Sequence, residues 1–322
     1  MKKKILLTGG AGFIGSRIYR RLQDRFDVMV LDNFDEFYPV KYKLDNLGLS
    51  EKPRYGSSRG SIFNCDILDK ETMDSIVSER NIDIVIHCAA LPGVRQSIKT
   101  PYTYYDVNFM GTVNVLDICR KHDIRKFIML SSSSVYGNID VPFSETDNCS
   151  CQSVYASSKL NGENAARLYH NIYGIDSVIL RLFSVYGPCQ RPDLVLHRFF
   201  LNAMNNIKSS VFGSLMTARD YTYVGDIAAV MDSVIEYTDN NNAFEVFNIG
   251  SGRMINMEKL LGTVKQYFPG FEYEITNAKE GESVKTYADI SKAQSVLGYS
   301  PHTVFEEGVK EFYEWFRGYY NE

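Results

Sequence analysis

The chain has 322 residues, of which 44% are hydrophobic, and its formal net charge is −4. This length is enough for a large core in one domain or in two closely joined domains. Charged residues of both signs are spread along the chain, which argues against a nucleic-acid partner. No apolar run approaches the roughly 20 residues of a membrane helix, and no secretory signal precedes the first predicted strand. We therefore expect a cytoplasmic protein with no membrane contact.

The six cysteines do not form a metal-binding or disulfide pattern. They show no C-x-x-C spacing, and only Cys149 and Cys151 lie close together. No second cysteine pair or histidine pair accompanies these two. We interpret all six as reduced thiols and predict no metal site.

The first structural signal is a glycine turn between a predicted strand and a predicted helix. The apolar segment Ile5–Leu7 is typical of a strand buried on both faces of a parallel sheet. In the stretch Thr8–Gly15, we expect Gly9 to permit a tight turn, Gly12 the close approach of a pyrophosphate, and Gly15 the packing of helix on strand. Such turns also occur as hairpins or helix caps. A strand before it and a helix after it favour a dinucleotide site, because free N–H groups at a helix start bind phosphate.

Apolar runs and helical patterns then alternate, as in a doubly wound parallel α/β sheet. The polar segment between residues 33 and 61 is long, and we expect a surface or substrate-facing loop there. The predicted strands lie at Val28–Leu31, Ile62–Cys65, Ile84–His87, Phe127–Leu130 and Ser177–Leu182, with a helix at Met73–Val77.

Beyond Gly187 this alternation ends. Prolines and glycines separate shorter helices and strands, and an amphipathic helix near Phe305–Tyr320 closes the chain. We predict two units: a dinucleotide-binding domain over residues 1–187, to which strands after residue 220 contribute, and a smaller α/β lobe over residues 188–322.

Two aspartates follow predicted strands. Asp32 ends the second strand, where a carboxylate accepts hydrogen bonds from the ribose hydroxyls of adenosine and repels a 2′-phosphate. Asn33 follows it in place of an arginine, which favours NAD over NADP. Asp66, after the third strand, would reach the adenine edge. Both aspartates are also explained as caps of strand-end turns.

The strongest chemical pattern is Tyr155 and Lys159 after the serine run Ser131–Ser134. Tyr155 and Lys159 are four residues apart, so they share one face of a helix. A tyrosine acts as a base only when its pKa of about 10 is lowered, and a nearby ammonium favours the phenolate. A serine hydroxyl can donate to the same substrate oxygen. Y-x-x-x-K alone arises by chance in many helices, but here it accompanies a strand-end serine cluster and a glycine turn.

Together these motifs resemble an extended short-chain dehydrogenase/reductase of the NAD-dependent nucleotide-sugar epimerase/dehydratase branch. The resemblance extends over nearly the whole chain. It implies a Rossmann-type NAD-binding domain, tightly held NAD, a UDP-sugar in the second lobe, and a homodimer formed as a four-helix bundle by helices around residues 103–122 and 154–171. The matching segments are Thr8–Gly15, Asp32-Asn33, His87–Ala90, Asn108 with Gly111, Ser131–Gly137, and Tyr155 with Lys159.

The resemblance also implies a role for each matching residue. Ser132 would be the catalytic hydroxyl, Tyr155 the base and Lys159 its ribose-binding partner. NAD would contact Gly9, Gly12, Phe13, Ile14, Gly15, Asp32, Asn33, Asp66, Ile67, Cys88, Ala89, Ala90, Asn108, Tyr155 and Lys159. The substrate would contact Ser132, Ser133, Ser134, Ser184, Arg191, Arg198 and Arg219.

Some of these residues have a plain structural alternative. Arg219 would hold the UDP phosphates, or form a surface ion pair. Arg191 would face the sugar, or lie in a solvated turn beside Pro192. Tyr136 and Phe183 would line the nicotinamide, or pack in the core.

The serine run distinguishes among the reactions of this branch. Similar 4,6-dehydratases carry an Asp-Glu pair before Val-Tyr-Gly, and uronate decarboxylases carry a Glu directly before the Val. Here the two positions are Ser133 and Ser134, which cannot act as carboxylic acids or bases. The pattern therefore favours 4-epimerisation, in which a hydride leaves C4 and returns.

Three stretches resemble UDP-glucuronate 4-epimerases: Ala90–Ser97, Phe183–Asp193 and Thr286–Ala293. Oxidation of a uronate at C4 gives a β-keto acid that readily loses CO2, so an epimerase must hold the carboxylate with charge-assisted hydrogen bonds. The resemblance places Arg191 and the serines there. The chain departs from the pattern at Leu91-Pro92, Ser184, Leu194 and Lys279–Glu282. A UDP-glucose or UDP-N-acetylglucosamine 4-epimerase, a non-catalytic NAD-binding scaffold and an NADP-dependent reductase remain as alternatives.

Overall fold

The computed structural model describes residues 2–277 and 285–320. The Lys279–Glu282 departure lies outside the described residues. Among those residues, no helix combines the length and the apolar character needed to cross a membrane.

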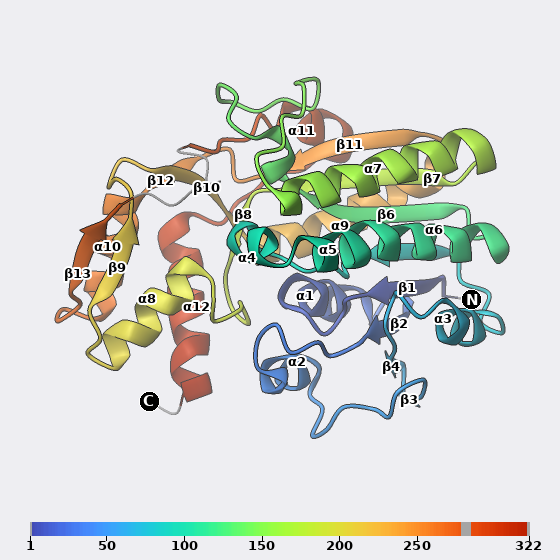
Figure 1. The fold of residues 1–322 in the computed structure, drawn as a ribbon, viewed down its shortest axis with the longest axis horizontal. Helices are drawn as coiled ribbons and strands as arrows, with labels where there is room; N and C mark the ends of the chain where they lie inside the picture. Colours follow the sequence, from blue (N-terminus) through green and yellow to red (C-terminus); the bar gives the residue numbers. More distant parts are fainter. Residues whose placement is uncertain (1, 278–284, 321–322) are drawn as a thin grey trace.

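An eight-stranded sheet forms the larger lobe (Figure 1). Its strand order is β11-β7-β6-β5-β1-β2-β4-β3, and every pairing is parallel except that of β3 with β4. The α/β, doubly wound prediction is confirmed. The strands are β1 (Lys4–Thr8), β2 (Asp27–Asp32), β3 (Ser58–Arg59), β4 (Ile62–Asn64), β5 (Ile84–His87), β6 (Lys126–Ser132), β7 (Asp176–Leu182) and β11 (Phe244–Ile249).

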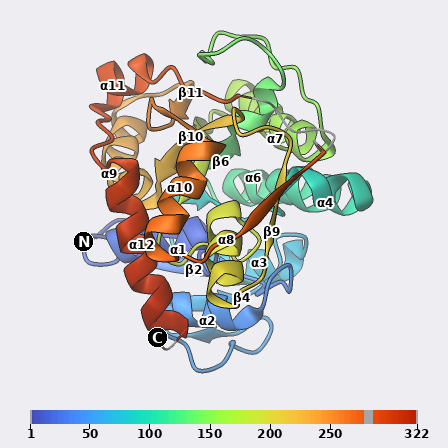
Figure 2. The same cartoon turned by 90° about the vertical axis from the view of Figure 1, so that its left-hand side faces the viewer.

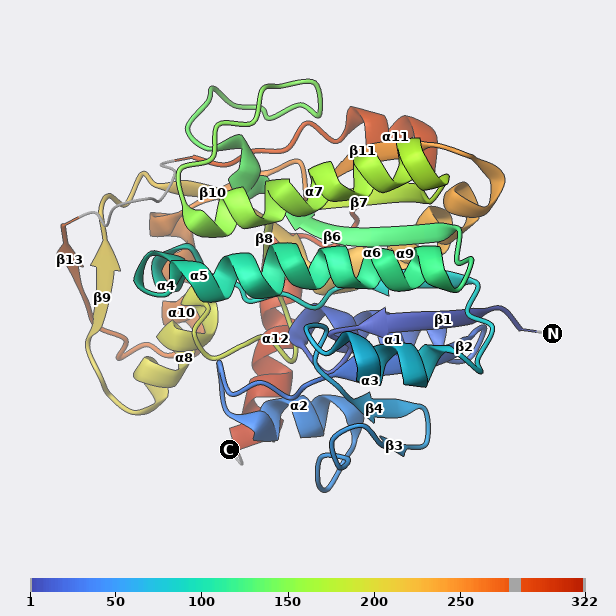
Figure 3. The same cartoon turned by 45° about the vertical axis from the view of Figure 1, so that its right-hand side comes forward.

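Helices cover both faces of this sheet because its strands are apolar on both sides. One face carries α1, α2, α9 and α11, and the other carries α3, α6 and α7, as their shared core clusters show (Figure 3). The helices of this lobe are α1 (Phe13–Leu22), α2 (Val40–Leu47), α3 (Lys70–Val77), α4 (Val94–Lys99), α5 (Pro101–Tyr104), α6 (Gly111–Lys121), α7 (Val154–Tyr173), α9 (Val224–Asn240) and α11 (Ser291–Leu297), with a π-helical turn η1 (Tyr105–Met110) and a 3-10 turn η2 (Ser133–Tyr136).

The expectation of one long loop between residues 33 and 61 is wrong, because α2 and β3 lie within it. Val40, Leu44 and Leu47 recur at helical spacing and pack against the core. Lysine, tyrosine and aspartate residues surround them in the sequence, which hides this short amphipathic pattern.

The smaller lobe has its own core of aromatic and aliphatic side chains, where α12 packs with α8 and α10 (Figure 2). Its strands form a three-stranded sheet, β12-β10-β8, and a two-stranded sheet, β13-β9. The chain returns to the larger lobe for α9, β11 and α11. The elements of the smaller lobe are β8 (Ser184–Tyr186), α8 (Val195–Met204), β9 (Ser209–Phe212), β10 (Ala218–Tyr223), β12 (Met254–Asn256), α10 (Met257–Tyr267), β13 (Tyr273–Thr276) and α12 (Phe305–Tyr320).

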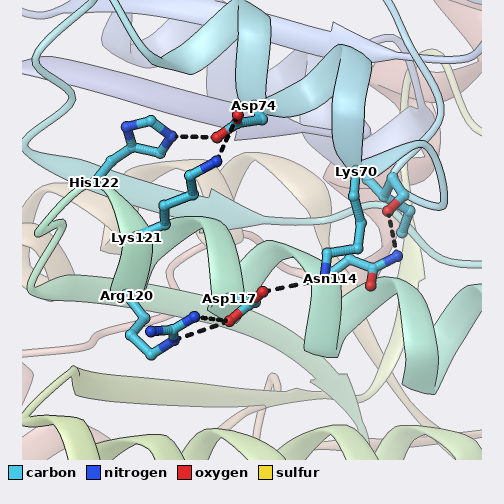
Figure 4. A network of polar contacts seen from close by, with 8 residues as sticks. Lys70, Asp74, Asn114, Asp117, Arg120, Lys121 and His122 are labelled. Carbon is cyan, nitrogen blue, oxygen red and sulfur yellow. Dashed lines mark hydrogen bonds and ion pairs between the residues drawn. The ribbon is translucent and has the colours of Figure 1, made fainter.

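Polar contacts between α3 and α6 hold the loop that follows β4 (Figure 4). Asn114 donates to the carbonyl of Ile67 at 3.1 Å, and the Asn114 side chain is buried. Exposed ion pairs surround this bond, among them Asp74–Lys121 at 2.7 Å and Lys70–Asp117 at 3.1 Å. Because exposed pairs contribute little, the buried Asn114 bond is the contact that positions Ile67.

Candidate active site

A cavity of about 1160 Å³ lies between the two lobes, with its wall formed by loops at the carboxyl ends of the larger lobe's strands and by residues 184–221 of the smaller lobe. Ligands of open parallel α/β sheets bind at this edge. The volume lies above the roughly 300–1,000 Å³ of sites for single drug-sized ligands. Residues of both lobes line it.

All but one of the residues predicted for cofactor and substrate line this cavity. Asn108 is the exception. The cofactor set on the wall is Gly9, Gly12, Phe13, Ile14, Gly15, Asp32, Asn33, Asp66, Ile67, Cys88, Ala89, Ala90, Tyr155 and Lys159, and the substrate set is Ser132, Ser133, Ser134, Ser184, Arg191, Arg198 and Arg219.

The glycine turn brings three backbone segments into contact. Gly9 adopts φ +69°, and a Cβ there would lie 2.5 Å from the Ala89 nitrogen. A Cβ on Gly15 would lie 2.2 Å from the Gly9 carbonyl oxygen, so α1 packs directly on the turn. A Cβ on Gly12 would meet only that same oxygen, at 3.2 Å. Beyond Gly12 the space opens into the cavity, at the N-terminal end of α1.

Asp32 is held by two backbone donors. Its carboxylate accepts from Ala11 N–H at 3.0 Å and from Phe34 N–H at 2.8 Å, and Lys43 Nζ lies 4.0 Å away. Burial raises the pKa of Asp32, and Lys43 followed by the two backbone bonds acts against that rise. Asp32 thus caps a turn and also faces the cavity, so the two interpretations of this residue are compatible.

Asn33 and Asp66 are joined across the sheet edge. The Asn33 amide donates to Asp66 at 2.8 Å, and the other oxygen of Asp66 accepts from Leu68 N–H at 2.8 Å. These bonds orient both side chains at the same end of the cavity as Asp32.

Asn108 acts from behind the wall. It is fully buried on η1, accepts from Leu91 N–H at 2.7 Å, and donates to the Leu91 carbonyl at 3.0 Å. It also donates to Ser158 on α7 at 3.0 Å. Asn108 therefore positions the loop after β5 and α7 relative to each other.

Ser132, Tyr155 and Lys159 meet where β6 ends and α7 begins. Ser153 caps α7 by accepting from Ala156 N–H at 3.1 Å, which fixes the first turn of the helix. The Tyr155 hydroxyl is hydrogen-bonded to Ser132. Lys159 lines the same wall with 3% of its surface exposed.

The pKa values of this group differ from the expectation that Lys159 lowers the pKa of Tyr155. Burial raises the pKa of Tyr155, and the opposing effects come from the Ser132 hydrogen bond and then from Arg191. Burial also lowers the pKa of Lys159 to about 8, against the effects of Cys88 and Glu163. Desolvation is the largest effect on the pKa of both groups.

The serine run and Arg191 line the same cavity. Ser133 and Ser134 form η2 after β6, and Ser132 donates to Ser134 at 3.1 Å. Arg191 makes a two-bond ion pair with Asp193, at 2.9 and 3.0 Å, and its side chain is 16% exposed. Arg191 is therefore a held, mostly enclosed guanidinium and not a solvated turn residue.

Arg219 and Asp220 point to opposite sides of β10. Asp220 is buried and accepts from Ser251 N–H at 2.7 Å and from Gly252 N–H at 3.1 Å. Strand alternation turns Arg219 toward the cavity. The surface ion pair between these two neighbours is not the arrangement found.

Tyr136 and Phe183 differ in position. The Tyr136 ring is fully buried, and its hydroxyl donates to Asn248 at 2.7 Å, so this residue belongs to the core. Phe183 lines the cavity.

The larger-lobe half of the cavity fits a dinucleotide. The open space at Gly12 suits a pyrophosphate, and Asp32 offers a carboxylate beside it. Tyr38 also lines the cavity, and its buried hydroxyl has no hydrogen-bond partner among the described residues, so it requires one from a ligand or from water.

The model of the family described as NAD dependent epimerase/dehydratase matches residues 5–250 of the chain. The chain belongs to the NAD-dependent epimerase/dehydratase family. The predicted cofactor, NAD, is thereby confirmed, and the resemblance drawn from the motifs is correct.

Several proteins with solved structures or assigned activities resemble the chain over nearly its whole length. A UDP-glucuronic acid 4-epimerase from Bacillus cereus, solved with UDP-glucuronic acid and NAD, is 34% identical with a TM-score of 0.89, over 98% of this chain and 100% of that one. A UDP-glucose 4-epimerase from Thermotoga maritima, solved with UDP-glucose, is 30% identical with a TM-score of 0.88, over 98% and 99%. A UDP-glucuronate 4-epimerase from Thermodesulfobacterium geofontis is 32% identical over 96% of this chain and 95% of its own length.

Two residues that line the cavity, Lys43 and Arg95, were given no role from the sequence. Lys43 lies on α2, which was not predicted. Arg95 and Arg198 lie over the Phe212 ring at 4.8 and 5.9 Å, so the smaller-lobe end of the cavity contains Arg95, Arg198 and Arg219 together. Arg95 is part of the Ala90–Ser97 segment. It is the one charged residue of that segment, and this could have marked it as a candidate for binding a phosphate.

Proposed function

We propose that this enzyme interconverts the C4 epimers UDP-glucuronate and UDP-galacturonate. The observation that carries the proposal is a set of hydroxyl donors, Ser132, Ser133, Ser134 and Ser184, in one cavity with Arg191 and Tyr155. The two positions that would hold a carboxylate in a dehydratase or decarboxylase are serines. This donor set suits a substrate that carries its own carboxylate.

In the proposed reaction, Tyr155 acts as the phenolate, takes the proton of the sugar 4-hydroxyl and becomes the neutral hydroxyl. The Ser132 hydroxyl, already bonded to Tyr155, shares that oxygen. Lys159 holds the cofactor ribose and keeps a positive charge beside the tyrosine. NAD, when bound, would supply the acceptor for the C4 hydride and the donor for its return to the other face of the sugar.

The side chains that bind the sugar carboxylate are the ones that prevent the oxidised uronate from losing CO2. The Arg191 guanidinium is partly neutralised by Asp193, so we assign most of the carboxylate hydrogen bonds to the neutral serine hydroxyls. Asp193 fixes the orientation of the guanidinium fork. Arg219 and Arg198 would hold the diphosphate while the sugar changes its contacts.

The deciding experiment incubates the purified protein, without added NAD, with UDP-glucuronate, UDP-glucose or UDP-N-acetylglucosamine, and identifies the products by NMR. We expect the C4 epimer of the uronate, and no product from Tyr155→Phe. Turnover of only the neutral sugars would replace the proposal with the UDP-glucose or UDP-N-acetylglucosamine alternative. A pentose product would show that the carboxylate is lost. A Tyr155→Phe variant as active as the parent would contradict the role given to Tyr155.

We also propose that two copies of the chain form a homodimer through α5, η1, α6 and α7. Large apolar side chains are exposed on these elements, among them Tyr102, Met110, Leu168 and Ile172. The helices α6 and α7 lie side by side on one outer face (Figure 3). Pairing of this face across a two-fold axis would give the four-helix bundle expected from the sequence.

A further inference from the structure

Helix α2 lies between the cofactor half of the cavity and the C-terminal helix. Its inner side contacts the cofactor-binding residues: Lys43 Nζ is 4.0 Å from Asp32, and the Asn46 amide donates to the Ala11 carbonyl of the glycine turn at 3.1 Å. Asn46 is buried, as is Lys43. A shift of α2 would therefore move two contacts at the place where the dinucleotide binds.

The outer side of α2 is joined to the last turn of α12, more than 270 residues later in the chain (Figure 2). The rings of Tyr42 and Tyr319 stack with centroids 5.0 Å apart, and the hydroxyls of Tyr42 and Tyr320 are hydrogen-bonded. The Tyr319 hydroxyl donates to Asp45 at 3.0 Å. We call Tyr42, Tyr319 and Tyr320, together with His197, the tyrosine cluster.

His197 extends the cluster to the other side of the cavity. Its Nδ1 lies 2.9 Å from the Gln190 carbonyl, and its Nε2 lies 3.0 Å from the Tyr320 hydroxyl. A carbonyl only accepts, so Nδ1 carries the proton. Burial lowers the pKa of His197 to about 4, so the ring is neutral near pH 7 and Nε2 accepts from Tyr320. Tyr320 in turn accepts from Tyr42.

The three hydrogen bonds run in one donor order: Tyr42 on α2 donates to Tyr320 on α12, Tyr320 donates to His197, and His197 donates to the Gln190 carbonyl. Gln190 lines the cavity and is followed by Arg191, the arginine assigned to the sugar. The tyrosine cluster thus ties the segment behind Asp32 to the segment that carries Arg191, across the two lobes.

We propose that the tyrosine cluster holds the two lobes together around the bound dinucleotide and so sets how tightly NAD is retained. Its members are positioning residues, because they lie outside the cavity wall and act through α2 and Gln190. The proposal rests on the cofactor of the family and is independent of which sugar is the substrate.

The test uses Tyr320→Phe, which removes one hydroxyl and keeps the ring. Protein stripped of cofactor is titrated with NAD by calorimetry. We expect NAD to bind the variant at least about fivefold more weakly than the parent, the lower end of usual coupling between sites. Tyr313→Phe is the matched control, since it lies on the same helix with its ring packed on Tyr267, and it should bind NAD like the parent.

The chain's single tryptophan gives a second readout that does not depend on activity. Trp315 stacks on Tyr319 at 5.2 Å, so its emission reports on the cluster. NAD should change this emission in the parent and much less in Tyr42→Phe. Asp45→Ala removes the acceptor of the Tyr319 hydroxyl from the side of α2. It should also weaken NAD binding, and it replaces Tyr320→Phe as the test if that variant fails to fold. NAD affinity equal to that of the parent in Tyr42→Phe and Asp45→Ala, or an equal loss in Tyr313→Phe, would overturn the proposal.

Discussion

Tyr155 and Lys159 carry opposite charges when ionised, and the enclosure of the site disfavours both charged forms. Burial raises the pKa of Tyr155 and lowers that of Lys159. Lys159 therefore remains charged at neutral pH at a cost to folding, which is consistent with a residue retained for binding or chemistry and not for stability.

We predict that the stability of the parent relative to Lys159→Met rises with pH between about 8 and 10.5, the folded and ordinary pKa values of the lysine. In that window the unfolded chain binds a proton that the folded chain has lost, so stability increases with pH. Below pH 8 both states are protonated, and the buried ammonium is a constant penalty of roughly 3 kcal/mol. Urea denaturation of both proteins across this range measures the difference. A difference that is flat from pH 7 to pH 10.5 would contradict the prediction.

The contact between β6, β7 and α7 depends on a buried ion pair directly behind the serine run. Arg181 on β7 pairs with Glu163 on α7 at 2.7 Å, and both side chains are almost fully buried. Ser131 donates to the same carboxylate. The pair thus joins the strand that ends in Ser132 to the helix that carries Tyr155 and Lys159.

We predict that Arg181→Met lowers the free energy of unfolding by about 3–5 kcal/mol, because it leaves a buried carboxylate without its partner. The double variant Arg181→Met with Glu163→Gln should recover part of this loss. The exposed pair Lys259–Glu306 is the control, since Lys259→Met should cost less than about 1 kcal/mol. Both losses are measured by chemical denaturation. Equal losses for the buried and the exposed pair would contradict the prediction that removing Arg181 leaves a buried carboxylate without a partner.

At the scale of elements, the sequence predicts best where side chains are apolar and partners are close in the chain. The predicted strand Ile84–His87 and the helix Phe305–Tyr320 match β5 and α12 at both ends. Helix α2 was missed because it is short and rich in charged residues. The pairing of β11 with β7 depends on contacts distant in sequence, which no local pattern encodes.

In the candidate site, too, the residues in local motifs were predicted and those that depend on distant contacts were not. Gly9, Asp32 and Tyr155 belong to local motifs, and the structure brings all three to one cavity. Lys43 was missed together with the helix that carries it. The opposite directions of Arg219 and Asp220 follow from the alternation of side chains along a strand. This alternation could be applied only after β10 was identified in the structure. That Asn108 lies behind the wall could not be predicted, because it depends on the π-helical turn η1.

Across the whole molecule, the two lobes divide the site between them. The larger lobe supplies the dinucleotide half and the Ser132–Tyr155–Lys159 group, and the smaller lobe supplies Arg191, Arg198 and Arg219. Helix α7 belongs to both this site and the proposed dimer face, since Tyr155 is in its first turn and Leu168 and Ile172 are near its end. Dimer formation would therefore restrain the catalytic helix from the side opposite the sheet.

We predict that Leu168→Glu converts a dimer, with twice the 36.7 kDa mass of the chain, into a monomer. A charge placed in an apolar interface would be desolvated without a partner, whereas in the monomer it stays in water. Ile207→Glu is the control, because Ile207 is 54% exposed on the smaller lobe and Leu168 is 56% exposed on α7. Light scattering coupled to size-exclusion chromatography at matched concentrations gives the masses. A parent that is monomeric, or a Leu168→Glu variant that stays dimeric, would show that this face does not form the interface.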